Sequence, residues 1–346
     1  MSLGSVRARP VVLGFAVAGV LLGALLVVVG VDDVAAAMSG ARPLPMVTAA
    51  GVVVLWLLAW AATFRVVLDA MAVRYTGRET LLGYLTLVFA NNVLPIALLG
   101  GEALTALAIA RATGGRFEST LAALASVDAI NYLPVPTLAV FGLAYFGATA
   151  VLGRPGPAVA GVLLAVGLGV LGLSVVAWRY RDRLREAAVV GVTGVLGGIG
   201  RVVPGLTPPT ARVVHDGVTA FGRSVVRVAS DRPRLALALA LGLSGWLLQG
   251  AALWLSLSAL DHVVPAAVAL FVVPLAAVAD VVPVPGGLGG VEATLVFLIV
   301  TTTGIPVADA TAATLLYRVV TYWLPTLVGG AAAAVLTDTP AAEPAG

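Results

Sequence analysis

Four uninterrupted apolar segments constrain this chain more than any other feature of its sequence. They are Val11–Val31, Met46–Leu68, Ala158–Trp178 and Leu235–Ala259. Each is long enough to cross a bilayer, since a transmembrane helix needs about 20 residues. Only 11% of the residues are charged while 60% are hydrophobic, too few charges to cover the surface of a soluble domain of this length. The sequence therefore predicts an all-α integral membrane protein.

Two further apolar regions are interrupted by polar residues, prolines and glycines. Leu81–Ala110 contains Asn91-Asn92, Pro95 and Gly100-Gly101, and Ala266–Thr303 contains Asp280, Pro283, Pro285 and the run Gly286–Gly290. Backbone that leaves a helix at membrane depth needs protein or water around it to satisfy its amides. We therefore expect re-entrant, broken helices here. Each is followed by a proline-containing apolar stretch, Leu121–Leu152 or Ala310–Leu336, in which we expect a kinked helix.

The arginines predict the orientation of these segments. Every basic residue is an arginine, and half of them lie in the connector 179–234. The positive-inside rule places this connector in the cytoplasm, and Arg7 and Arg9 place the N-terminus there too. Counting the spans returns the C-terminus to the cytoplasm as well. The first apolar segment exceeds the usual length of a signal-peptide core, so we expect it to be retained as a helix. The arginines report orientation, so no nucleic-acid partner is expected.

The two halves of the chain align at a constant offset of 190 residues. Pro95 falls on Pro285, Gly100 on Gly290, Glu102 on Glu292 and Tyr132 on Tyr322. Each half then reads as helix, helix, re-entrant broken helix, helix, and the arginines predict that the halves enter the membrane from opposite sides. Such inverted repeats are common in secondary transporters. The predicted division is a first repeat at 1–157, a second at 158–338 including the connector, and a disordered tail at 339–346.

Polar residues at the two interruptions are the candidate substrate site. Glu102 and Glu292 each open a helical stretch, where a carboxylate either caps the free N–H groups or serves a cation or a proton. Arg318, equivalent to Asp128, is expected either to pair with Glu292 or Asp280 or to bind a lipid phosphate. The asparagines cap helix ends or line a polar path, and the glycines bind an anion or allow close helix packing. The predicted substrate-binding residues are Asn91, Asn92, Gly101, Glu102, Asp128, Asp280, Gly286, Gly287, Gly289, Glu292, Tyr317 and Arg318.

No arrangement of residues typical of an enzyme was found. The chain has no cysteine, and His215 and His262 are too far apart in sequence to suggest a metal site. The longest hydrophilic segment is too short for a separate catalytic domain. We therefore expect no catalytic residues, no metal and no cofactor.

Three motifs carry a resemblance to a known family. They are Asn92-Val-Leu-Pro95 with Gly101-Glu102, Pro283-Val-Pro-Gly-Gly-Leu-Gly-Gly-Val-Glu292, and Leu316-Tyr-Arg318-Val-Val-Thr-Tyr-Trp-Leu-Pro325. Together they resemble the lysylphosphatidylglycerol synthase transmembrane-region family, also called the flippase-like domain family. The resemblance implies a prokaryotic plasma-membrane protein that moves polar-headed phospholipids or polyprenyl-linked lipids between leaflets. The family usually has an Arg-x-x-Asp-like pair in the first half, where this chain reads Val127-Asp128-Ala-Ile-Asn131.

Two other functions fit the sequence and remain open. One is a secondary transporter that couples a small solute to H⁺ or Na⁺. The other is a non-transporting membrane partner of a lipid-modifying enzyme or glycosyltransferase, docked on the arginine-rich connector. The expected partners are therefore membrane lipids and, in the last case, such an enzyme.

Overall fold

The computed structural model describes residues 8–71, 75–94, 100–113, 117–138, 230–281 and 284–338, and positions 140–142, 145, 168–169, 172 and 179. Throughout these residues the regular structure is helical, without strands. Six helical stretches of the described chain are long and apolar enough to cross a membrane, which confirms the predicted all-α membrane fold. Of the connector 179–234, only Arg179 and its last five residues are described. The predicted span Ala158–Trp178 falls mostly outside the described residues.

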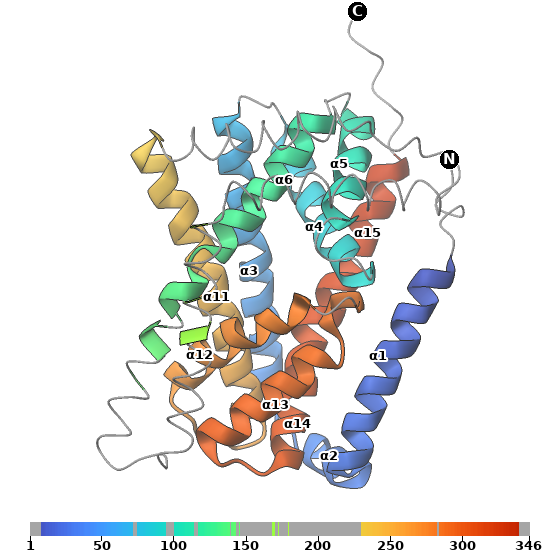
Figure 1. Cartoon of the computed structure of the whole chain (residues 1–346), viewed down its shortest axis with the longest axis vertical. Helices are drawn as coiled ribbons and strands as arrows, with labels where there is room; N and C mark the ends of the chain where they lie inside the picture. Colours follow the sequence, from blue (N-terminus) through green and yellow to red (C-terminus); the bar gives the residue numbers. More distant parts are fainter. Residues whose placement is uncertain are drawn as a thin grey trace, which may run out of the picture.

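The helices of the two halves follow each other in a similar order (Figure 1). The first half contains α1 (Ala8–Val29), α2 (Val31–Ser39), α3 (Pro43–Ala70), α4 (Gly77–Val93), α5 (Gly100–Thr113) and α6 (Phe117–Tyr132). The second half contains α11 (Arg232–Ala259), α12 (Ala266–Ala276), the 3₁₀ turns η2 (Ala277–Val281) and η3 (Pro285–Gly287), α13 (Gly290–Thr303), α14 (Val307–Arg318), the π-helical turn η4 (Val319–Trp323) and α15 (Leu324–Asp338).

The long helices α3 and α11 pack against each other along the centre of the protein. The backbone N–H of Arg42 donates to the carbonyl of Ala259 at 2.8 Å, and the indole N–H of Trp60 donates to the carbonyl of Gly242 at 3.2 Å. Residue numbers thus rise along one helix as they fall along the other, so the two helices are antiparallel. Glycine makes the contact close, because a Cβ on Gly245 would lie 1.8 Å from the Trp60 indole nitrogen.

Both interrupted regions are broken where the sequence places its prolines and glycines. In the first, α4 ends at Val93 and α5 begins at Gly100; in the second, α12 is followed by two short 3₁₀ turns before α13. At 1.5 Å per residue, α4 is about 25 Å long, which is shorter than the hydrocarbon core of roughly 30 Å. Pro95 and Pro283 themselves lie outside the described residues.

The kink predicted in Ala310–Leu336 is present as a π-helical turn. This turn, η4, ends two residues before Pro325. Proline has no backbone N–H and its ring crowds the preceding turn, so the regular hydrogen-bond pattern cannot continue through it. One extra residue in the turn is a common response, and such π-bulges often occur at functional sites. In the first half, α6 ends at Tyr132 and a turn follows at 133–134, where Pro134 stands.

The offset of 190 residues also relates the limits of the helices. It places α5 on α13, the start of α6 on the start of α14, and α3 within one residue of α11. Tyr75, after the end of α3, has its hydroxyl 2.7 Å from that of Thr120 in α6, while His262, after the end of α11, lies 3.0 Å from Asp309 in α14. Because α3 and α11 are antiparallel, α6 and α14 begin at opposite ends of the protein (Figure 1). This arrangement supports the predicted inversion of the two halves.

The close packing of α3 on α11 gives a test of the fold. We expect Gly245→Ala to lower stability by about 1–3 kcal/mol, because the added methyl group overlaps the Trp60 ring. Gly51→Ala in α3 is the matched control: its Cβ meets nothing within 4 Å, and alanine favours a helix. Thermal unfolding of the purified protein in detergent measures both. Equal melting temperatures for the two variants would contradict the packing described here.

Candidate functional site

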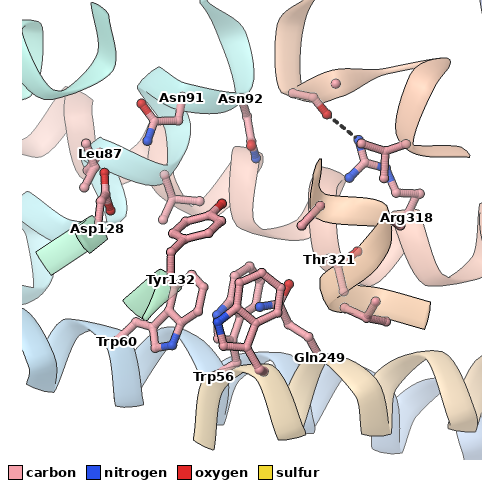
Figure 2. A pocket seen from close by; sticks show the side chains of 18 of the residues that line it. Trp56, Trp60, Leu87, Asn91, Asn92, Asp128, Tyr132, Gln249, Arg318 and Thr321 are labelled. Carbon is pink, nitrogen blue, oxygen red and sulfur yellow. Dashed lines mark hydrogen bonds between the residues drawn. The ribbon is translucent and has the colours of Figure 1, made fainter. Parts of the chain in front are cut away.

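A cavity of about 550 Å³ lies between the two halves of the protein. Its walls come from α3, α4, α5 and α6 of the first half and from α11, α12, η2, η3, α13, α14 and η4 of the second. Figure 2 shows Asp128 on one side of the cavity, Arg318 on the other, and the aromatic residues Trp56, Trp60 and Tyr132 between them. Residues that are far apart in the sequence thus meet around this cavity, whose lining is mainly apolar with polar groups on opposite sides.

Most of the predicted site residues line this cavity. Those that do are Asn91, Asn92, Glu102, Asp128, Gly286, Gly287, Tyr317 and Arg318. Glu292 does not: it is 1% exposed and lies behind Arg318. Gly289 precedes α13 and is not among the lining residues, and Gly101 lies in the first turn of α5, where its surroundings are outside the described part of the structure. Asp280 lies in η2, and its side chain is outside the described part of the structure.

Arg318 forms a buried ion pair with Glu292, one of the two partners expected for it. Its Nε donates to Glu292 Oε1 at 2.6 Å, and its Nη2 donates to the carbonyl of Gly286 at 2.7 Å. The guanidinium also stacks on the Tyr322 ring, with its central carbon 4.6 Å from the ring centroid. An arginine side chain has five N–H donors, so these two bonds leave part of the fork for a ligand in the cavity.

Glu292 also caps the helix that it opens. Its Oε2 accepts a hydrogen bond of 2.5 Å from the backbone N–H of Gly289. The two roles considered for this carboxylate, capping and pairing with a cation, therefore coexist in one side chain. The pair connects the first turn of α13 to the end of α14, and so sets the position of Arg318.

The glycine run forms a tight turn whose N–H groups are largely used within the chain. Gly286, Gly287 and Gly289 have φ values of 53°, 63° and 88°, in the region that favours glycine. The N–H of Gly287 donates to Val284, and that of Gly289 donates to Glu292. A Cβ on Gly286 would come within 2.2 Å of the Tyr322 ring. These contacts favour the close-packing role of the glycines over a role in binding an anion.

Asn92 joins the broken helix of the first half to the π-helical turn of the second. Its Nδ2 donates to Thr326 Oγ1 at 2.8 Å and to the carbonyl of Tyr322 at 3.4 Å. The Tyr322 hydroxyl donates in turn to the carbonyl of Asn92 at 3.1 Å. Asn92 thus connects α4, at the first interruption, to η4 and α15 of the second half. Asn91, the next residue back, has a buried Oδ1 with no hydrogen-bond partner among the described residues.

Glu102 and Asp128 form a pair of acids in the cavity wall. Their side chains come from α5 and α6 and lie close enough to interact directly. Two neighbouring carboxylates repel each other, and a proton bound to one of them removes that repulsion. At the 190-residue offset this pair corresponds to Glu292 and Arg318. The contact is thus formed in both halves, by two acids in one and by an acid and a base in the other.

The aromatic wall of the cavity is not among the predicted site residues. Trp60 contacts Trp56 and Trp246 with ring centroids 5.4 and 5.7 Å apart, and Tyr132 packs on Trp246 at 5.3 Å. The indole N–H of Trp246 donates to the carbonyl of Asn131 at 2.7 Å, which holds the ring in place. The repeat contained a signal for this wall, because the same offset places Trp56 on Trp246.

The distribution of charge within the cavity is uneven. Arg318, neutralised by Glu292, lies on the side of the second half, and the two acids lie on the side of the first. Trp56 Nε1 and Gln249 Nε2 also line the cavity with buried donors that lack a partner among the described residues. No group of three or more His, Asp or Glu side chains suited to a metal occurs in the described part of the chain. The lining is therefore suited to a polar ligand in an aromatic setting.

The fold and the cavity define a polytopic helical membrane domain with a polar site between two halves. The chain belongs to the family described as the lysylphosphatidylglycerol synthase TM region, whose family model matches residues 11–329. This match confirms the family indicated by the three sequence motifs, and with it a multi-pass membrane protein. No match to a curated protein was found for the chain.

The buried ion pair makes a second prediction. Glu292→Gln and Arg318→Gln should each destabilise the protein by roughly 3–5 kcal/mol, because each leaves a charge without its partner in a buried place. The double variant should lose less than the sum, and the difference is the coupling energy of the pair. Thermal unfolding of the purified variants measures the cycle.

The control for this cycle is an exposed pair. Arg42 and Asp261 lie 3.0 Å apart with side chains 55% and 72% exposed. Arg42→Gln and Asp261→Asn should each change stability by less than about 1 kcal/mol. Additive effects of Glu292→Gln and Arg318→Gln would show that the buried contact does not hold α13 and α14 together.

Proposed function

We propose that this protein moves polar-headed phospholipids or polyprenyl-linked lipids between membrane leaflets, with the headgroup passing through the cavity between the two halves. The observation that carries the proposal is the position of Arg318 in the cavity wall. Arg318 lines a cavity inside a membrane domain, and its contacts with Glu292 and Gly286 leave part of its N–H fork for a ligand. Arginine binds phosphate with several hydrogen bonds at once, and phosphate is the group that such lipid headgroups share.

The antiparallel halves support translocation rather than static binding. Equivalent helices begin at opposite ends of the protein, and the broken segments of both halves meet at the cavity. In inverted-repeat transporters, rocking of one half against the other exposes a fixed central site to each side of the membrane in turn. The Asn92–Tyr322–Thr326 contacts join the halves beside the site, where such a movement would be transmitted.

This proposal includes no catalytic step and places the protein in the plasma membrane of a prokaryote with both termini in the cytoplasm. Membrane lipids are then its ligands. Uptake of a small solute, or binding of a lipid-modifying enzyme without transport, are the competing outcomes of the experiments below.

Lipid translocation by the reconstituted protein is the direct test. Vesicles that contain the full chain and fluorescent phosphatidylglycerol are treated with a reagent that bleaches only the outer leaflet. Arg318→Lys keeps the charge that pairs with Glu292 but removes the planar fork of N–H donors. We expect the translocation rate to fall about tenfold or more, the effect of losing roughly 1.4 kcal/mol of stabilisation.

Arg42→Lys, in the exposed pair with Asp261, is the matched control and should translocate lipid at the wild-type rate. If Arg318→Lys and wild type bleach at equal rates while both are folded, Arg318 does not contact the headgroup. If wild-type vesicles bleach no faster than protein-free vesicles, lipid translocation itself is wrong.

The opposite orientation of the halves is tested by cysteine labelling. The native chain has no cysteine, so a single introduced thiol is unique. Ser119→Cys lies near the start of α6 and Val307→Cys at the start of α14, at equivalent ends of the two halves. A membrane-impermeant maleimide applied to intact cells should label Val307→Cys and leave Ser119→Cys unlabelled until the cells are opened. Labelling of both from outside would rule out the inverted arrangement.

A further inference from the structure

The acid pair Glu102–Asp128 holds a position that a cation occupies in the other half. The two pairs lie at the same spacing, since 26 residues separate Glu102 from Asp128 and also Glu292 from Arg318. In the second half the contact is an ion pair with 2.6 Å between Arg318 Nε and Glu292 Oε1. In the first half it is a contact between two acids that both line the cavity. No cation of the chain stands at the position equivalent to the guanidinium.

Near the acid pair, two buried hydrogen-bond acceptors have no donor among the described residues. Glu102 Oε2 is buried and has no hydrogen-bond partner among the described residues, and the same is true of Asn91 Oδ1 on α4. Both residues line the cavity beside Asp128. Buried polar atoms are nearly always hydrogen-bonded, so unpaired acceptors next to a carboxyl pair indicate a ligand that donates. A proton added to the pair supplies such a donor.

The charged and titratable groups around the pair are few. On the described faces packed against α5 and α6, Tyr84 of α4 and Tyr132 of α6 lie near Asp128, and Arg318 lines the same cavity from the second half. The residues of α3 and α11 that line the cavity are uncharged: Trp56, Trp60, Trp246 and Gln249. In α3, Arg65 and Asp69 are half-exposed and pair with each other. Arg318 is already neutralised by Glu292, so an anionic headgroup beside the two acids adds to their negative charge.

We propose that Glu102 and Asp128 form a proton-binding site, and that an anionic lipid headgroup and a proton bind to the cavity cooperatively. This inference rests on the proposed lipid translocation. An anion close to two acids disfavours loss of a proton from them, because like charges repel. By thermodynamic reciprocity, a proton on the pair strengthens binding of the anion by the same factor. The headgroup and the proton then cross the membrane together, so a pH gradient drives net lipid movement.

Binding of phosphatidylglycerol to the purified full-length protein tests the coupling. The affinity should rise as the pH falls, with a slope of at most about tenfold in Kd per pH unit for one proton. Asp128→Arg, which copies the ion pair of the second half, should bind lipid with a pH-independent Kd over the same range. Asp128→Asn keeps a hydrogen-bonding partner for Glu102 and should flatten the slope in the same way. Asp261→Asn is the exposed control and should keep the wild-type slope.

Infrared spectroscopy gives a readout that does not depend on lipid. A protonated carboxyl has its own carbonyl stretch, and wild-type protein at neutral pH should show one that disappears in Asp128→Asn. Absence of this band, or an affinity that falls at low pH, would overturn the proton site. An affinity that depends on sodium at constant pH would assign the position to that ion instead.

The two proposals fail in distinguishable ways. Reconstituted vesicles with a pH gradient should accumulate fluorescent phosphatidylglycerol in one leaflet, and a protonophore that removes the gradient should abolish the accumulation while the lipid still equilibrates. Fast translocation that ignores the gradient would leave the lipid-transport function standing and remove the proton coupling. Lipid binding that depends on pH, in a protein that does not translocate lipid, would support the proton site and rule out the transport function.

Discussion

The ion pair between Arg318 and Glu292 is the interaction on which the site depends. Glu292 is almost wholly buried and closes the turn at Gly289, while Arg318 reaches from the end of α14 to bind Glu292 and the carbonyl of Gly286. A broken helix at membrane depth has free backbone groups that lipid cannot satisfy. Here one carboxylate and one guanidinium satisfy several of them at once. Glu292 and Arg318 bind the Gly289 N–H and the Gly286 carbonyl, and these bonds stabilise the broken segment. Arg318 also lines the cavity.

The first half keeps this architecture but changes its charges. Glu102 retains its place in the first turn of the helix after the break, and Asp128 stands where the other half has arginine. Two acids cannot satisfy each other as an ion pair does, because like charges repel. The two halves therefore share a fold but differ in the chemistry of this contact. In the proposed function, one half binds the headgroup with an arginine and the other provides a site whose charge varies with a bound proton.

Several parts of this structure could be predicted from the sequence, for identifiable reasons. Membrane spans follow from the length of apolar runs, and the breaks follow from proline and glycine, which act on their own neighbourhood. The partners of Arg318 could be reduced to Glu292, Asp280 or a lipid phosphate because few charged residues occur in the apolar segments after the connector. The aromatic wall was missed because tryptophan is ordinary in membrane helices, and its contacts form through the antiparallel packing of α3 and α11, which brings Trp246 onto Trp60. The bond between Asn92 and Thr326 joins residues more than two hundred positions apart, and no local pattern encodes such a contact.

The aromatic wall also limits how the headgroup can be held. Trp60 and Trp246 are anchored by their indole N–H groups to backbone carbonyls of Gly242 in α11 and Asn131 in α6, which fixes their ring planes. In the proposed function, these rigid rings give a headgroup a surface without strong hydrogen bonds, Arg318 binds its phosphate, and the acid pair on the other side binds a proton. A site that bound every part of the headgroup tightly would release it slowly. In the proposed function, Arg318 and the acid pair recognise the ligand at the two sides of the cavity. The rings between them bind it weakly enough to be released, as transport requires.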